Sequence, residues 1–394
     1  MILKNAFIYD TSIKQKCDIQ IKNGIIVKID SNISDNDDIL DCTNKTIMPQ
    51  FIDLNVLPKN KTLSRKSLLS LAEKSMKGGV GSIVLNSDTN PKIDNEMAIE
   101  FIKGINNDLQ VDIYPSISSV NNENKICDIS IMHSLGGIGI SLQSNQSPNT
   151  IDKIAKYAKM LDIPIFVNAD DNLGGVINYG VMSAKLGLPP KNPLSEIKEV
   201  AKILEVAIFY NIKIVFRCIV EPRSIKLINE AKKLNKNIFC ETSIHHLILN
   251  DESCDNYNTS AKINPPLKDK KTQEILIENL KENNIDLLTS LQCACYNSLK
   301  EKVFSEAEFG IDGIAYYFSL IFTNLVKNDI IDLQKISTIC SKNPAKILNL
   351  NYGEIKVGKL AKLMVLNLKS SYKIEDFFLP YNNQICDGVI EKFI

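Results

Sequence analysis

The first 50 residues alternate between apolar and polar side chains, which is the pattern of half-buried β-strands. The alternation covers residues 2–9, 18–22 and 24–29. Asn23-Gly24 supplies a two-residue hairpin turn between the second and third stretches. The N-terminal segment is therefore predicted to form a small antiparallel sheet.

From Phe51 onward, short apolar stretches are separated by longer segments with apolar residues at three-to-four spacing, which is typical of parallel βαβ units. Helices are predicted at 63–76, 151–160, 197–210 and 224–234. Strands are predicted at 51–55, 82–85, 111–114, 137–141, 163–167, 213–217, 237–240 and 286–289. This repeat fits a closed (β/α)8 barrel better than an open doubly wound sheet, because no GxGxxG follows the first of these strands.

Beyond the barrel, a helix is predicted to close near Asn343-Pro344, and residues 353–368 return to strand character. Strand sequence at both ends of a barrel suggests that the two chain termini pair with each other. The predicted fold class is therefore α/β. Residues 51–350 form the (β/α)8 TIM barrel, and residues 1–50 and 351–394 form a small composite β domain.

Charge and composition exclude several classes of partner. Lys+Arg 46 balances Asp+Glu 46, so there is no electrostatic footprint for nucleic acid or an anionic membrane surface. No apolar run approaches the roughly 18 residues that a membrane span needs. The ten cysteines include no CxxC pair and follow no signal-peptide pattern, which favours free thiols and a cytoplasmic location.

Active sites of such barrels lie at the C-terminal ends of the strands. A hydrolytic divalent-metal site needs several imidazoles and carboxylates that converge there and leave a position open for an activated water. The whole chain has only three histidines. The side chains at the predicted strand ends are mainly amides, hydroxyls, one thiol and a leucine, at Asn55, Leu57, Gln143, Ser144, Asn145, Asn168, Cys218, Ser290 and Leu291.

Eight sequence stretches, in order along almost the whole chain, resemble dihydroorotases, metal-dependent (β/α)8 hydrolases of the amidohydrolase superfamily. They are MPQFIDLNVLPK (48–59), GGVGSIVLNSDTNP (78–91), GVMSAKLGLPPKNPLSE (180–196), ETSIHHLIL (241–249), NPPLK (264–268), FGIDGI (309–314), NPAKIL (343–348) and GEIKVGKLAKLMVL (353–366). The resemblance implies the amidohydrolase type of barrel with its composite β domain.

The resemblance also implies that the metal centre is lost. The family's paired histidines fall on Asn55 and Leu57, and its later metal-binding histidines fall on Asn168 and Cys218. The bridging acidic group falls on Ser144 or Asn145. The catalytic aspartate falls on Ser290, so no carboxylate remains there to take a proton from a metal-bound water. No catalytic residue and no metal cofactor are expected.

The family's substrate-binding positions are only partly kept. Its arginine is Lys59, which cannot form a planar bidentate pair with a carboxylate. One of its asparagines is Asp88, whose charge would repel an anionic substrate, while Asn264 is retained. These three residues are candidates for vestigial ligand binding.

Several residues admit both a functional and a structural interpretation, and the structural one is favoured for each. His245-His246 matches a family turn whose histidines are not metal ligands, and His133 stands alone. Cys218, Cys293 and Cys295 could hold zinc as a replacement site, although buried free cysteines are common. The carboxylate pair Asp170-Asp171 could serve in acid-base chemistry, but solvation or helix capping is favoured. The apolar stripe at 314–325 is predicted to be a helix that packs on the barrel, or a partner surface if it is exposed.

The sequence is compatible with three functions. Dihydroorotase-like chains without metal ligands serve as non-catalytic partners of aspartate carbamoyltransferase in pyrimidine synthesis. The resemblance therefore implies a catalytically inactive structural or regulatory subunit of a homo- or hetero-oligomer. The alternative is an active amidohydrolase that opens cyclic amides at a non-standard zinc site built from Cys218, Cys293, Cys295 or His246. In the third hypothesis, the pocket in which the family binds its substrate instead binds a regulatory small molecule through Lys59 and Asn264.

Overall fold

The computed structural model describes residues 1–34, 37–171 and 173–394. Its central element is a barrel whose paired strands, among the described residues, run parallel. The strands, in order, are β6 (Phe51–Val56), β7 (Val80–Leu85), β8 (Asp112–Pro115) with β9 (Ile117–Ser118), β10 (Ile140–Gln143), β11 (Ile165–Asn168), β14 (Ile214–Phe216), β15 (Ile238–Ser243) and β16 (Leu287–Thr289). All eight predicted strands are present within these described residues, displaced by at most three positions.

The barrel closes between β16 and β6. Leu57 and Cys293 form a parallel bridge just beyond these strands, and the Thr289 hydroxyl donates to Asp53 Oδ1 at 2.7 Å. The (β/α)8 prediction is therefore confirmed.

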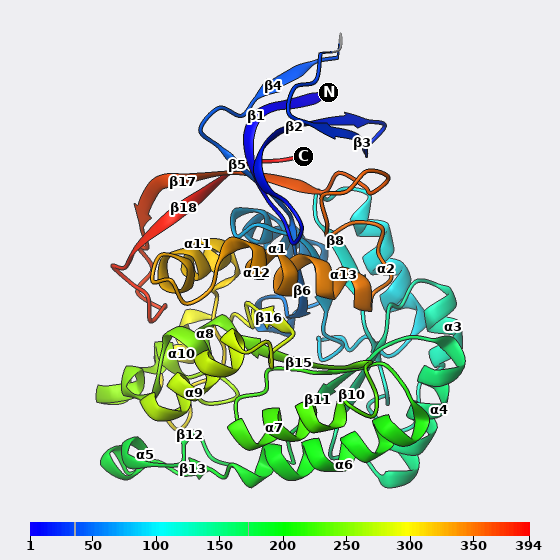
Figure 1. Cartoon of the computed structure of the whole chain (residues 1–394). Helices are drawn as coiled ribbons and strands as arrows, with labels where there is room; N and C mark the ends of the chain where they lie inside the picture. The colour runs from blue at the N-terminus through cyan, green and yellow to red at the C-terminus, as the bar shows by residue number, and fades with distance from the viewer. Residues whose placement is uncertain (35–36, 172) are drawn as a thin grey trace.

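Helices cover the outside of the barrel (Figure 1). The main ones are α1 (Arg65–Lys77), α2 (Glu96–Asn106), α3 (Ile129–Ser134), α4 (Pro148–Leu161), α6 (Leu194–Tyr210), α7 (Pro222–Ala231) and α9 (Lys270–Lys281). Polar side chains start several of them, as Ser64, Asn95, Ser147 and Asp269 each accept a first-turn backbone N–H. Among the described residues, no helix has the length and apolar character needed to cross a membrane.

Shorter elements lie in the loops around the barrel mouth. They are η1 (Lys59–Lys61), β12 (Ile177–Asn178), α5 (Val181–Leu186), β13 (Pro190–Lys191), α8 (Ile244–Ile248), η2 (Asp251–Tyr257), η3 (Thr259–Ala261) and α10 (Asn297–Lys300). These loops lie at the strand ends where the predicted site residues are found.

Two predictions about the last helices have different outcomes. The apolar stripe forms η4 (Ile314–Tyr316), α11 (Tyr317–Ile321) and η5 (Phe322–Val326), and its aromatic residues pack on Phe51, so the packing interpretation is confirmed. The helix predicted to close near Asn343-Pro344 instead continues through α12 (Leu333–Ser337), η6 (Thr338–Lys342) and α13 (Asn343–Ile347). Pro344 has no N–H to donate, and it stands where the wider π-helical turn η6 passes into α13.

The two chain termini form one sheet, as predicted (Figure 1). Its strands are β1 (Ile2–Tyr9), β2 (Lys14–Lys22), β3 (Ile25–Asp30), β4 (Ile39–Asp41), β5 (Thr46–Pro49), β17 (Leu363–Lys373) and β18 (Ile385–Phe393). The order is β18-β17-β5-β1-β2-β3, and β4 pairs with β1. Asn23 and Gly24 both have positive φ, 52° and 73°, and they form the predicted hairpin turn between β2 and β3.

A separate apolar cluster fills the barrel interior away from the C-terminal ends of the strands. It includes Ile52, Phe166 and Val215 from the strands, and Leu348 and Tyr352 from the segment after α13. This plug leaves the upper end of the barrel, at the C-terminal strand ends, as the place where a polar site can form.

Candidate functional site

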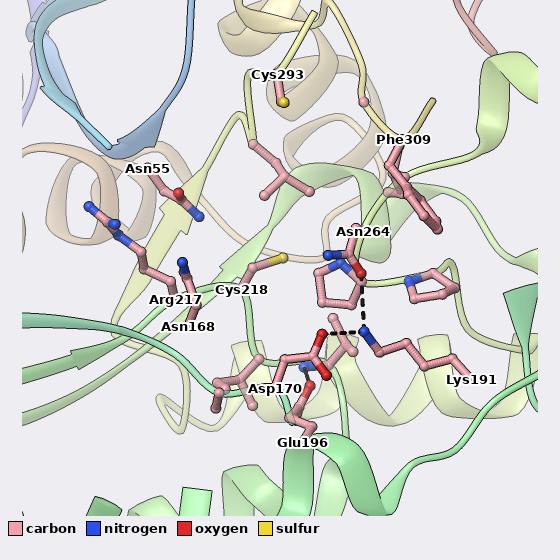
Figure 2. A pocket seen from close by; sticks show the side chains of 18 of the residues that line it. Asn55, Asn168, Asp170, Lys191, Glu196, Arg217, Cys218, Asn264, Cys293 and Phe309 are labelled. Carbon is pink, nitrogen blue, oxygen red and sulfur yellow. Dashed lines mark hydrogen bonds and ion pairs between the residues drawn. The ribbon is translucent and has the colours of Figure 1, made fainter. Parts of the chain in front are cut away.

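A cavity of about 340 Å³ opens at the barrel mouth. Asn55, Leu57, Asn168 and Cys218, which occupy the metal positions implied by the resemblance, all line it. In Figure 2, Asn55, Asn168 and Arg217 lie on one side of this cavity, and Asp170, Lys191, Asn264 and Glu196 lie on the other. Ser290 is fully buried and lies outside the lining, and its backbone N–H donates to Asp53 at 2.8 Å.

Glu241 organises the side of the cavity around Asn55. Its Oε1 accepts hydrogen bonds from Asn55 Nδ2 and from the backbone N–H of Cys218, both at 3.2 Å. Burial, followed by the charge of Asp53, raises the pKa of Glu241 to about 8. Glu241 directly follows the strand predicted at 237–240, but no site residue was predicted from that strand, and sequence reasoning missed this carboxyl group. Asn55 therefore bonds to a buried carboxyl.

Asp53 performs a similar structural role beneath the cavity. Besides the Ser290 N–H and the Thr289 hydroxyl, it accepts the backbone N–H of Asn55 at 3.1 Å. Burial raises the pKa of this fully buried carboxyl group. These bonds tie the first barrel strand to the last.

Arg217 supplies a buried positive charge beside these two acids. Its guanidinium donates to the Ser141 hydroxyl at 2.9 Å and to the Leu54 carbonyl at 3.0 Å, and it lies 4.6 Å from the centre of the Phe166 ring. The residue is only 3% exposed, and burial lowers its pKa to about 10. The barrel mouth thus contains a guanidinium whose charge offsets the neighbouring carboxylates. Sequence reasoning also missed this residue.

Both histidines of the His245-His246 pair are fully engaged. His245 Nε2 donates to the Ser290 carbonyl at 2.8 Å, so Nδ1 accepts from the Tyr381 hydroxyl at 2.6 Å. His246 Nε2 donates to the Pro265 carbonyl at 3.0 Å, and Nδ1 accepts from Ser243 at 2.7 Å. Burial lowers the pKa of His245 to about 4 and that of His246 to about 3. Both rings are therefore neutral and have no ring nitrogen available for a metal.

The cysteines at the mouth are poor zinc ligands in this arrangement. Cys218 Sγ lies 3.9 Å from His246 Nδ1, and burial raises the pKa of its thiol. Burial also raises the pKa of Cys293 to about 11, and Cys295 lies outside the cavity lining. A thiol must lose its proton to bind zinc, and these surroundings oppose that loss.

The donor atoms at the mouth do not fit a catalytic divalent metal. Leu57 has no donor atom, the Asn55 amide bonds to Glu241, and Ser290 is outside the cavity. Within the described ranges, no group of three or more His, Cys, Asp or Glu residues is arranged to hold a metal ion. These side chains lack the imidazole and carboxylate ligands with which hydrolytic enzymes hold a metal ion and activate the water bound to it.

The predicted ligand-binding residue Lys59 lies elsewhere. Asn60 and Lys61 have positive φ, 53° and 56°, and this backbone reversal places Lys61 on the main cavity while Lys59 lies over the ring of Tyr296 at 5.4 Å. The expectation that Lys59 and Asn264 share one pocket was therefore wrong. Lys61 forms an ion pair with Asp88, so the carboxylate that was expected to repel anions is compensated.

Asn264 does line the cavity, where it belongs to a charged network. Lys191 Nζ donates to Asn264 Oδ1 at 3.4 Å and forms an ion pair with Asp170. Asp170 also accepts from the Ser195 hydroxyl. Asp171 accepts from Ser195 at 2.9 Å and pairs with Lys198. The Asp170-Asp171 pair thus anchors the loops by ion pairs, instead of standing in solvent.

Glu196 is a further buried acid on the cavity wall that sequence reasoning missed. It accepts the backbone N–H groups of Val220 and Glu221, at 3.2 and 3.0 Å. Burial, followed by the charge of Glu221, raises its pKa to about 7, although Lys268 forms an ion pair with Glu221 nearby. Its position inside α6, far from any strand end, gave no signal in the sequence.

These pKa shifts predict that stability falls as the pH rises from about 6.5 to 8.5. Glu196 and Glu241 hold a proton more tightly in the folded protein, with pKa values of about 7 and about 8. The stability that they contribute therefore declines from their unfolded pKa of about 4.3 upward, and the last of it is lost through that range. The two buried histidines act in the opposite sense, but only below their unfolded pKa of about 6.5. We expect a loss of about 2–3 kcal/mol over this range.

Urea unfolding at both ends of that range measures the loss. Glu241→Gln keeps the shape of the protonated carboxyl group and should remove more than half of the pH dependence. A variant that keeps the full dependence would show that Glu241 is ionised throughout.

Comparison with known proteins identifies the family. The amidohydrolase family matches residues 131–392. A dihydroorotase-like protein of Helicobacter pylori strain J99 is 28% identical over 100% of this chain and 96% of its own length. A dihydroorotase of Thermoanaerobacter sp. strain X514 is 31% identical over 99% of this chain and 95% of its own length.

Solved structures support the same fold. An L-hydantoinase (dihydropyrimidinase) from Arthrobacter aurescens superimposes with a TM-score of 0.88, at 20% identity, over 100% of this chain and 94% of the other. A D-hydantoinase gives a TM-score of 0.84, also at 20% identity, over 100% and 93%. The barrel, the composite terminal sheet and these similarities lead to one conclusion. The chain is a dihydroorotase-like member of the amidohydrolase family.

Proposed function

We propose that this chain is a non-catalytic dihydroorotase-like subunit that acts in pyrimidine biosynthesis by binding aspartate carbamoyltransferase. The observation that carries the proposal is the chemistry of the barrel mouth. Leu57 offers no donor atom, and Asn55 is bonded to the buried carboxyl of Glu241. An intact barrel without a hydrolytic site favours a role in assembly.

The first test is for catalysis. The purified chain, with and without added Zn²⁺, should show no turnover of dihydroorotate or hydantoin, and should contain less than about a tenth of an equivalent of metal. Turnover that depends on a bound metal would overturn the proposal. It would instead support the alternative, an amidohydrolase with a non-standard site at Cys218, Cys293, Cys295 or His246.

A restored variant serves as the control for this test. It carries Asn55→His, Leu57→His, Asn168→His, Cys218→His and Ser290→Asp, which returns the ligand types at the positions that the resemblance identifies. If this variant binds metal and the natural chain does not, the missing side chains account for the difference.

The second test is for partnership. The chain and the aspartate carbamoyltransferase of the same organism should co-elute at micromolar concentrations, and the complex should differ from the free enzyme in oligomeric state or kinetics. Separate elution with no kinetic effect would remove the partnership from the proposal while leaving the loss of catalysis untouched.

A further inference from the structure

A second cavity, of about 250 Å³, lies outside the barrel mouth against helix α1. Lys59, Lys66 and Lys74 line it, together with the hydroxyl groups of Thr62, Ser64, Ser67 and Ser70. None of its lining residues is an aspartate or a glutamate. The cavity therefore combines positive charge with hydrogen-bond donors, in a chain whose overall formal charge is +0.

The charges at this cavity are only partly neutralised by the protein. Lys74 forms an ion pair with Asp312, which lies outside the lining. Within the part of the chain that the structure describes, Lys66 forms no ion pair, and the Lys59 ammonium is placed over the ring of Tyr296. Two cationic side chains thus face one concavity without a protein counter-charge, which favours an external anion.

The hydroxyl groups differ in how free they are to bind a ligand. Ser64 and Ser67 bond to each other at 3.0 Å, and Ser67 also donates to the backbone of Thr62 and Ser64. The Ser70 side chain is exposed, one helical turn from Lys66 and Lys74. Lys66, Ser70 and Lys74 therefore share one face of α1, and Lys59 approaches that cavity from the loop.

The cavity also has an apolar side, formed by Leu71, Ala294 and the ring of Tyr296. Its volume is sufficient for a phosphate group and a few carbon atoms. From this combination we propose that the α1 cavity binds a small phosphorylated metabolite, with the phosphate on Lys59, Lys66 and Ser70 and the organic part against Tyr296. This site is separate from the barrel mouth and does not depend on the proposed function.

Calorimetric titration of the full chain tests the site with inorganic phosphate, ribose 5-phosphate and ribose. Both phosphates should bind at one site and ribose should not, and binding should weaken as salt is added. Lys59→Ala combined with Lys66→Ala should weaken both phosphates about tenfold or more, because charge-assisted hydrogen bonds are lost. Tyr296→Ala should weaken ribose 5-phosphate more than inorganic phosphate.

Lys159→Ala is the matched control, since Lys159 is an exposed lysine near the end of α4, outside this cavity. It should leave both affinities unchanged. Equal weakening by Lys159→Ala and the double variant would indicate non-specific attraction of anions and would overturn the proposal. The absence of saturable phosphate binding by a folded natural chain would overturn it as well.

Discussion

Replacing His246 with alanine is expected to lower the free energy of unfolding by about 3–4 kcal/mol. The ring is 1% exposed, and its removal leaves a cavity in the packed wall below the mouth. The substitution also removes the hydrogen-bond acceptor of the Ser243 hydroxyl and the hydrogen-bond donor to the Pro265 carbonyl. His245→Ala should have a similar effect, because His245 bridges Tyr381 and the Ser290 carbonyl.

His133→Ala is the matched control for this prediction. His133 is half-buried, and Nδ1 donates to the Gly137 carbonyl at 2.8 Å, so its loss should cost about 1 kcal/mol or less. Urea unfolding of the three variants gives the comparison. A chelator should leave the natural chain as stable as before. If a chelator instead lowered its stability to that of His246→Ala, His246 would be a metal ligand.

The fold could be predicted from sequence because its signals are local and repeated. Alternating side chains with Asn23-Gly24 specified the β2–β3 hairpin, and βαβ periodicity specified the barrel. Errors came where neighbours set the outcome. The strand predicted at 137–141 lies at 140–143, where β10 pairs in parallel with β11. The turn at Asn60 and Lys61 places Lys59 at a different cavity from the one predicted.

The candidate site was predictable only at the strand ends. Asn55, Asn168 and Cys218 were found because the C-terminal ends of barrel strands converge. Glu241 lies within β15, Arg217 directly follows β14, and Glu196 lies within α6, and charged residues at such positions are ordinarily read as surface. Their burial follows from tertiary packing, and a single sequence does not show which charged side chains point inward.

Replacing Arg217 with alanine is expected to destabilise the protein by about 3–5 kcal/mol, because it leaves buried carboxyl groups without their cation. Arg217 is the charge that favours ionisation of Glu241, and it also satisfies Ser141 and the Leu54 carbonyl. Arg223→Met on the exposed surface of α7 is the control, and it should change stability by about 0.5 kcal/mol or less.

Arg217→Met separates the charge from the packing, because methionine keeps much of the side-chain volume. Without the guanidinium the pKa of Glu241 should rise further, so the loss should be larger at about pH 9 than at about pH 6, where Glu241 is already protonated. Adding Glu241→Gln should recover part of the loss at about pH 9, giving a coupling of about 1–3 kcal/mol between the two sites. Equal losses at both pH values, with no recovery, would mean that Arg217 stabilises the barrel through hydrogen bonds and packing alone. A measured coupling would instead show that its charge balances the acids at the barrel mouth.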